Sequence, residues 1–357
     1  MDRLKADYPW TLSPLISLAP MRLIALSHLA TETSRAGGLG FIGAGSSISS
    51  PSLPHLLSEA RSQIASSPNL RSVPDVLPIG VGFLLWAGDE LLQGALPLLE
   101  EFKPAAVWLF APHEVSEFEK WTREVRRVTG GKSKVWIQIG TVEEAVEVTR
   151  SCQPDVLVVQ GQDAGGHGLE KAAGLIALFP EVDDEVTRLC EAEGLTKPVL
   201  VASGGIMDGR GVAAAIALGA AGVTLGTRYL AAPEANLPKG YRDAVVKAKD
   251  GGVTTKRTKL YDQLRGTRDW PARYGGRGVL NYSWEDAEKG MSEEENQRLY
   301  DEALKKGDEG WGENARLATY AGAGVGLIKG LKSAARITEE VREDARKVLK
   351  TVGNIPS

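Results

Sequence analysis

A single histidine lies in a glycine-rich segment at the end of an apolar run. The run Val156–Val159 contains only aliphatic residues, as in a strand buried on both faces, and the segment Gln160–Gly168 that follows it carries His167. A glycine-rich turn offers a histidine no apolar face to fill, and it lets the backbone approach a ligand closely. Because an imidazole exchanges protons near neutral pH, we interpret His167 as a candidate general base. The alternative interpretation is an idle turn histidine that faces solvent.

Two further glycine turns follow apolar runs later in the chain. They are Ser203, Gly204 and Gly205 after the run Val199–Ala202, and Gly226 and Thr227 after the run Gly222–Leu225. Glycine lets phosphate oxygens reach the backbone N–H groups, and serine or threonine hydroxyls add hydrogen bonds. The two turns together predict a phosphate site. Arg228, next in the chain, is either a further phosphate ligand or a structural residue.

Eight short apolar runs recur through the first two thirds of the chain, and stretches of helical character separate them. The runs are Leu15–Ala19, Gly40–Gly43, Leu77–Phe83, Ala106–Phe110, Val135–Ile139, Val156–Val159, Val199–Ala202 and Gly222–Leu225. Apolar runs without alternation, in regular succession with helices, are typical of a parallel sheet. Eight such units predict an α/β fold of the (β/α)8 TIM-barrel class. In that fold the strand ends share one catalytic face, which would bring His167 close to the predicted phosphate site.

The chain changes character after Leu230. Residues 234–335 are polar and charged, and they include the Gly/Arg-rich run Trp270–Gly278 and an acidic helical stretch over 283–307. We expect this segment to form an additional C-terminal, mostly helical lid subdomain over the catalytic face, with its charges in solvent. The barrel would then span residues 1–233, and an amphipathic helix within 336–357 would complete it.

Composition argues against several classes of partner. The net charge of −4 gives no global basic field for nucleic acid or anionic membranes, and 43% hydrophobic residues suit a globular chain. No apolar run reaches the roughly 20 residues of a membrane span, and no secretory leader is visible. Cys152 and Cys190 have neither metal-ligand nor redox spacing. We therefore expect a cytoplasmic enzyme that acts on small molecules, with no metal, nucleic-acid or membrane partner, and the sequence allows a homo-oligomer.

Four segments together resemble the nitronate monooxygenase (2-nitropropane dioxygenase) family. They are Ala19–Met21, Gln160–Gly168, Ala202–Ile206 and Leu225–Tyr229, and the likeness extends into the C-terminal region at 241–281 and 322–326. The Ala-Gly-Gly-His element that ends at His167 is specific to this flavin superfamily. The resemblance implies an FMN-dependent oxidoreductase that oxidises alkyl nitronates or nitroalkanes with oxygen, giving a carbonyl compound and nitrite.

The resemblance also implies roles for individual residues. His167 would take the α-proton of a nitroalkane or position a preformed nitronate. Gln138 would hydrogen-bond the flavin ring, and Met21 would pack beside it; the alternative for Gln138 is a satisfied amide inside the barrel. The other implied FMN contacts are Ala19, Pro20, Gly161, Gly165, Gly166 and Ser203, together with Gly204, Gly205, Gly226 and Thr227 around the phosphate.

Two positions depart from the family pattern, and alternatives stay open. Many relatives have asparagine where this chain has Gly82, and glutamine where it has Ala323, so two side-chain contacts to the flavin are missing. Flavin reductases that use NAD(P)H to reduce quinones or enoyl thioesters are similar in the Ala-Gly-Gly-His loop. The electron donor is therefore a nitronate or a nicotinamide, and a flavin-binding barrel without turnover is a third interpretation. Among the other histidines, only His113 is a rival to His167.

Overall fold

In the computed structural model, which describes residues 2–353, the eight apolar runs form a closed parallel barrel. Its strands are β1 Leu15–Leu18, β2 Phe41–Gly45, β3 Leu77–Leu84, β4 Pro104–Phe110, β5 Lys134–Ile139, β6 Val156–Gln160, β8 Val199–Ser203 and β9 Gly222–Leu225. They pair in the order β1-β9-β8-β6-β5-β4-β3-β2, and the Leu18 N–H closes the ring by donating to the Leu39 carbonyl at 3.0 Å. The predicted TIM barrel and all eight predicted strands are confirmed.

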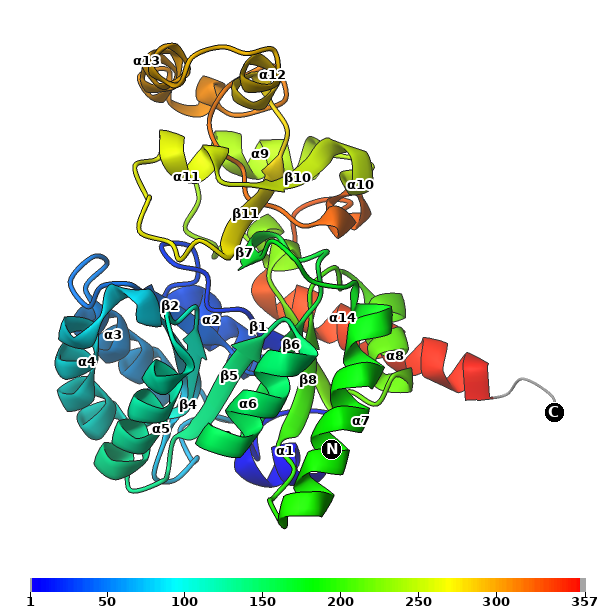
Figure 1. Cartoon of the computed structure of the whole chain (residues 1–357). Coiled ribbons are helices and arrows are strands. Elements are labelled where there is room, and N and C mark those ends of the chain that lie inside the picture. The colour runs from blue at the N-terminus through cyan, green and yellow to red at the C-terminus, as the bar shows by residue number, and fades with distance from the viewer. Residues whose placement is uncertain (1, 354–357) are drawn as a thin grey trace.

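Helices surround the barrel (Figure 1). They are α2 Ser27–Arg35, α3 Leu53–Ala65, α4 Asp89–Phe102, α5 Val115–Thr129, α6 Val142–Cys152, α7 Leu175–Glu193, α8 Gly209–Ala217 and α14 Ala334–Gly353. The last of them, α14, packs against α8 and α2. Residues 354–357 of the expected C-terminal helix lie outside the described residues. No helix within residues 2–353 is both long and apolar enough to cross a membrane.

Aromatic rings fill the interior of the barrel. The ring centroids of Trp108 and Trp136 are 5.7 Å apart, and that of Phe41 lies 5.2 Å from each of them. Gly80 makes room for this cluster, because a Cβ atom there would lie 2.2 Å from the Phe41 ring. Below the cluster, the Trp136 indole N–H donates to the Tyr8 hydroxyl at 2.7 Å. The barrel is therefore a packed core rather than a channel, as is usual for this fold.

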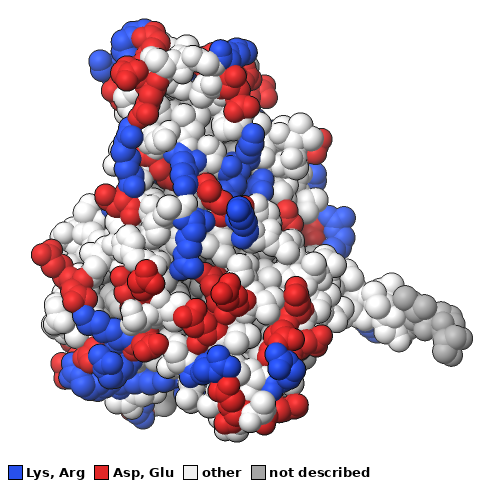
Figure 2. Space-filling model, in the orientation of Figure 1, with Lys and Arg blue, Asp and Glu red and all other residues white. Residues whose placement is uncertain are grey.

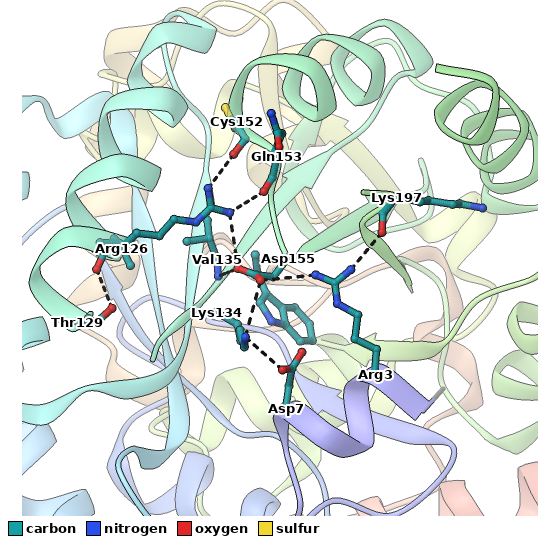
Figure 3. Close-up of polar contacts among 12 residues, drawn as sticks. Arg3, Asp7, Arg126, Thr129, Lys134, Val135, Cys152, Gln153, Asp155 and Lys197 are labelled. Carbon is teal, nitrogen blue, oxygen red and sulfur yellow. Dashed lines mark hydrogen bonds and ion pairs between the residues drawn. The ribbon is translucent and has the colours of Figure 1, made fainter. Parts of the chain in front are cut away.

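A network of charges closes the amino-terminal end of the barrel, where helix α1 Asp2–Asp7 crosses it (Figure 3). Its centre is Asp155, at the start of β6, whose carboxylate accepts the Val135 N–H at 2.9 Å. The cations Arg3, Arg126 and Lys134 lie 3.6–4.0 Å from the same carboxylate. One carboxylate therefore ties α1, α5 and two strands together.

The chain between β9 and α14 forms a second body above the carboxyl ends of the strands (Figure 1). We call residues 239–327 of this body the upper subdomain. Its helices and strands are α9 Lys239–Lys247, α10 Gly251–Thr254, β10 Thr255–Thr258, α11 Leu260–Leu264, β11 Tyr274–Val279, α12 Tyr282–Glu288 and α13 Glu293–Leu304. It is mostly helical, as expected, but β10 and β11 form a three-stranded antiparallel sheet with β7 Gly166–Leu169, which belongs to the barrel sequence.

For the run Trp270–Gly278 the sequence predicts no strand, only that its charges lie in solvent; the structure forms β11 there, and Arg273 and Arg277 are half-buried. Tyr274 and Val279 are buried, and a Cβ atom at Gly276 would lie 2.5 Å from the Tyr320 ring. The glycines of this run let an aromatic ring lie directly on the strand.

We expect Asp155→Ala to lower the free energy of unfolding by about 2 kcal/mol, because it removes a backbone acceptor and leaves three cations without their shared partner. Urea unfolding measures this change. The control is Glu101→Ala, which breaks the exposed Arg61–Glu101 pair at 3.2 Å and should cost about 0.5 kcal/mol or less. Equal effects of the two substitutions would show that the Asp155 network contributes no more than a surface pair.

Candidate active site

A cavity of about 760 Å³ lies between the carboxyl ends of the barrel strands and the upper subdomain. His167 and all but one of the predicted cofactor residues line it, namely Ala19, Pro20, Met21, Gln138, Gly165, Gly166, Ser203, Gly204, Gly205, Gly226 and Thr227. The upper subdomain contributes Tyr241, Arg265, Trp270, Tyr300, Trp311 and Tyr320. The structure thus brings residues that are far apart in sequence to one cavity, and His113 is exposed outside its wall.

The turn after β8 has a backbone that only glycine adopts easily. Gly204 and Gly205 have φ angles of +99° and +75°, in the left-handed region. A Cβ atom would lie 2.8 Å from the Gly161 carbonyl oxygen at the first position and 2.8 Å from the Asp163 Cβ at the second. Gly161 itself does not line the cavity; its N–H donates to the Ser203 carbonyl at 2.9 Å and so supports the turn from behind.

The turns after β8 and β9 together form a surface that we call the cradle, made of Ser203, Gly204, Gly205, Gly226 and Thr227. The turn after β9 connects the cradle to the upper subdomain. The Thr227 hydroxyl accepts the Gly322 N–H at 3.0 Å. Gly165 lies so close to this contact that a Cβ atom there would be 2.3 Å from the Gly322 nitrogen. Arg228 is buried and does not line the cavity, which favours the structural interpretation of this residue. The result is a small concave surface of glycine backbone with the hydroxyls of Ser203 and Thr227 at its edge, suited to a phosphate.

Gln138 has an amide nitrogen that needs a partner from the cavity. The Trp108 indole, which can only donate, gives its N–H to the Gln138 Oε1 at 3.1 Å. This bond fixes the orientation of the amide and leaves Nε2 buried without a hydrogen-bond partner in the part of the chain that the structure describes. A buried unsatisfied donor is costly, and an acceptor on a bound flavin ring would satisfy it. The residues present therefore fit a flavin.

The structure explains one of the two departures from the family pattern, the glycine at position 82. At Gly82, which lines the cavity, a Cβ atom would lie 2.3 Å from the Pro20 Cβ, so the asparagine of many relatives would require Pro20 to move. Ala323 does not line the cavity, although its N–H donates to the Asp163 carbonyl at 3.0 Å.

His167 lies on strand β7 rather than in a turn. Residues 161–165 form the expected loop after β6, but from Gly166 the chain becomes extended and pairs with β11, with His167 opposite Gly276. The prediction of a continuous glycine-rich turn is therefore wrong at its end. The reason is non-local, because the pairing partner is more than a hundred residues away and its own glycines conceal its strand character.

The side chains around the His167 ring come from the upper subdomain. The ring stacks on Trp270 with centroids 3.6 Å apart and planes 2° from parallel. Its Nε2 lies 2.8 and 2.9 Å from the two carboxylate oxygens of Asp262, on α11. The Tyr320 hydroxyl donates to the same carboxylate at 2.7 Å. Sequence reasoning missed Asp262, Trp270 and Tyr320, because nothing in their local sequence distinguishes them from surface residues of a polar segment.

Burial lowers the pKa of His167 below its ordinary value, and the positive charges of Arg257 and Arg265 act in the same direction. The hydrogen bond and charge of Asp262 oppose this shift without cancelling it. The imidazole is therefore neutral at physiological pH and able to accept a proton.

Two arginines that line the cavity have no carboxylate partner in the described part of the chain. Arg22, on the loop after β1, and Arg265, just after α11, both line the cavity, and neither forms an ion pair with any residue between 2 and 353. Burial lowers the pKa of Arg22, and the nearby charge of Arg265 lowers it further. Two positive charges in the lining of one cavity favour an anionic ligand there.

Arg257, on β10, holds the strand that carries His167 in place from the side. Its Nη1 donates to the carbonyls of Gly166 and Gly275 at 2.8 and 2.7 Å. Its Nη2 donates to those of Ala164 and Gln162 at 2.8 and 3.3 Å. Lys and Arg side chains gather on the surface between the barrel and the upper subdomain (Figure 2). One fork-shaped group thus binds four backbone carbonyls around the His167 strand.

We expect Arg257→Gln to lower the free energy of unfolding by about 2–3 kcal/mol and to speed hydrogen exchange at the amides of residues 164–168, because buried carbonyls lose their donor. Urea unfolding and amide exchange monitored by mass spectrometry measure the two effects. The matched control is Lys256→Gln on the same strand, where the side chain is exposed and contacts the Trp284 ring. Unchanged exchange in the Arg257 variant would contradict the assigned role.

Comparison with known proteins gives the family. The family model for nitronate monooxygenase matches residues 116–341. The chain is 46% identical to the nitronate monooxygenase npaC of Metarhizium robertsii over 98% of this chain and 96% of that protein. It is 37% identical to a nitronate monooxygenase of Neurospora crassa over 99% and 94% of the two chains.

Two solved structures share the fold. FabK from Thermotoga maritima matches with a TM-score of 0.74 at 24% identity, covering 99% of both chains. A nitroalkane oxidase from Streptomyces ansochromogenes matches with a TM-score of 0.73 at 21% identity, covering 98% of this chain and 99% of the other. At such identities the likeness concerns the fold alone, and the closer sequence relatives decide the family. The chain belongs to the nitronate monooxygenase family of flavin-dependent oxidoreductases.

Proposed function

We propose that the enzyme binds FMN and oxidises alkyl nitronates, and nitroalkanes after deprotonation, with oxygen to a carbonyl compound and nitrite. The observation that carries this proposal is the composition of the cavity lining, which includes a neutral imidazole and two arginines that have no carboxylate partner among residues 2–353. A nitronate is an anion and a nitroalkane is its neutral conjugate acid. A site that takes a proton and holds the resulting negative charge suits this pair of molecules.

Residues of the barrel would bind the cofactor. The cradle of Ser203, Gly204, Gly205, Gly226 and Thr227 would hold the phosphate of FMN, and the free Nε2 of Gln138 would donate to its ring. Met21 lines the cavity beside the cradle. When bound, the flavin supplies the electron-accepting chemistry of the reaction.

His167 is the proposed general base. In this role its imidazole takes the α-proton of a neutral nitroalkane, and the positive charges of Arg22 and Arg265 stabilise the anion that forms. A substrate that enters as a preformed nitronate has no proton to give. It needs from the protein only binding and orientation in the cavity.

The upper subdomain covers the reacting region. Its lining residues include Tyr241, Trp270, Tyr300, Leu304 and Trp311. By keeping water from the bound substrate, these side chains would strengthen the electrostatic contacts inside. The proposed partners are thus a small organic substrate and oxygen. We propose the cytoplasm as the location, in keeping with two cysteines that are free and buried.

We expect His167→Asn to reduce kcat/KM on a neutral nitroalkane by about 10²–10⁴-fold, the usual contribution of a general base, and to affect a preformed nitronate far less. In the wild type, the rate on the nitroalkane should fall as the pH drops through the lowered pKa of His167, hence below pH 6.5, because protonation removes the base. Steady-state kinetics between pH 5 and 8 with both substrates measure this.

The control is His113→Asn, an exposed histidine after β4, which should keep the wild-type profile. Equal losses on nitroalkane and nitronate in the His167 variant would overturn the assignment of His167 as the base.

A further inference from the structure

We propose that Asp262 is a positioning residue that selects the tautomer of His167 and leaves Nδ1 as the basic nitrogen. This inference rests on the proposed function for its kinetic consequence, but its structural part stands on contacts alone. A residue of the upper subdomain thus determines which nitrogen of the imidazole takes the proton.

The hydrogen bonds around Asp262 define the donor. Its Oδ1 accepts the Tyr320 hydroxyl at 2.7 Å and lies 3.3 Å from the Thr267 hydroxyl. Both carboxylate oxygens face His167 Nε2, at 2.8 and 2.9 Å. An ionised carboxylate only accepts hydrogen bonds, so the proton of the neutral imidazole resides on Nε2.

The other ring nitrogen is left for the ligand. No residue between 2 and 353 forms a hydrogen bond with His167 Nδ1, and the ring lines the cavity. Stacking on Trp270 at 3.6 Å fixes the plane of the ring, and the Asp262 contact fixes its rotation within that plane. A ring flip that presented Nε2 to the cavity would break the contact with Asp262 and leave a buried carboxylate without one of its donors.

The charged groups around His167 also favour proton transfer to its ring. The titratable and charged groups near His167 are Asp262, Tyr320, Arg257 and Arg265. When Nδ1 takes a proton, the imidazolium that forms lies in contact with the Asp262 carboxylate, which stabilises it. Burial keeps the resting imidazole neutral, and Asp262 limits the energy needed to protonate it.

The side chain that positions the base is thus not part of the barrel. Asp262 lies on α11, and Tyr320 lies on the segment that pairs with the end of β11 through the antiparallel Gly278–Tyr320 bridge. Both reach His167 because β7 leaves the barrel to pair with β11. A barrel without the docked upper subdomain would hold the cradle and Gln138 but would lack the group that orients the base.

The first test is a nuclear magnetic resonance measurement that does not depend on the substrate. Long-range ¹H–¹⁵N spectra of protein labelled with ¹⁵N-histidine, with the His167 signals assigned by their loss in His167→Asn, report which ring nitrogen carries the proton. We expect Nε2–H in the wild type at pH 7.5. In Asp262→Asn the new amide can donate as well as accept, so we expect a mixture of tautomers. A wild-type signal from Nδ1–H, or an unchanged tautomer in the variant, would overturn the proposal.

The second test is kinetic. Asp262→Asn should lower kcat on a neutral nitroalkane by about 10- to 100-fold, part of the contribution of a general base, while a preformed nitronate is oxidised at nearly the wild-type rate. The acidic limb of the pH profile should move to lower pH, because the charge that raises the pKa of His167 is gone. Asp262→Glu should recover part of the activity.

The control is Asp301→Asn, the same isosteric change on α13, where the residue is exposed and its carboxylate accepts the Gln297 amide at 2.9 Å. It should leave the tautomer and both rates unchanged. If Asp262→Asn shifts the tautomer but lowers the rate on nitronate as much as the rate on nitroalkane, the proposed function is contradicted and the role of Asp262 stands. Unchanged kinetics on both substrates and an unshifted limb would overturn the role of Asp262 in the reaction.

Discussion

The pairing of β7 with β11 is the constraint on which the site depends. Four residues of the barrel sequence, Gly166–Leu169, leave the ring of parallel strands and become the edge of a second sheet. This exchange carries His167 away from the barrel and places it among side chains of the upper subdomain. Arg257 stabilises the β7–β11 pairing by donating to backbone carbonyls just before and within β7 and to the Gly275 carbonyl on β11. Without this pairing the proposed base His167 would lie away from Asp262 and Tyr320.

The two halves of the cavity therefore have different physical characters. The barrel half is made of backbone in tight turns, with glycines at positions where a Cβ atom would collide with its neighbours, and it suits the fixed shape of a phosphate and a planar ring. The upper half is made of side chains, chiefly aromatic rings and Arg265, that reach down from several short elements. A division of this kind would keep the cofactor on a rigid scaffold and leave the substrate side to side chains of the upper subdomain.

The sequence predicts the barrel half well and the upper half poorly, for physical reasons. Each strand of the barrel is an apolar run such as Val156–Val159, whose burial is visible locally, and the phosphate turns are visible as glycines at the ends of such runs. His167 stands out for the same reason. Asp262 and Tyr320 do not, because their function arises only from contacts made across 95 and 58 residues of intervening chain. The strand β11 is concealed by the glycines that let Tyr320 lie on it.

The central claim is that electrons enter this cavity from a nitronate. The measurement that tests it most directly is anaerobic mixing of the yellow, flavin-loaded enzyme with propyl-2-nitronate in a stopped-flow spectrophotometer, with NADH and NADPH mixed separately. The account predicts that the nitronate bleaches or shifts the flavin absorbance within the time of one turnover, and that neither nicotinamide does so at a comparable rate. Rapid bleaching by NADH or NADPH with no response to the nitronate would contradict it and would place the enzyme among the reductases that share its fold.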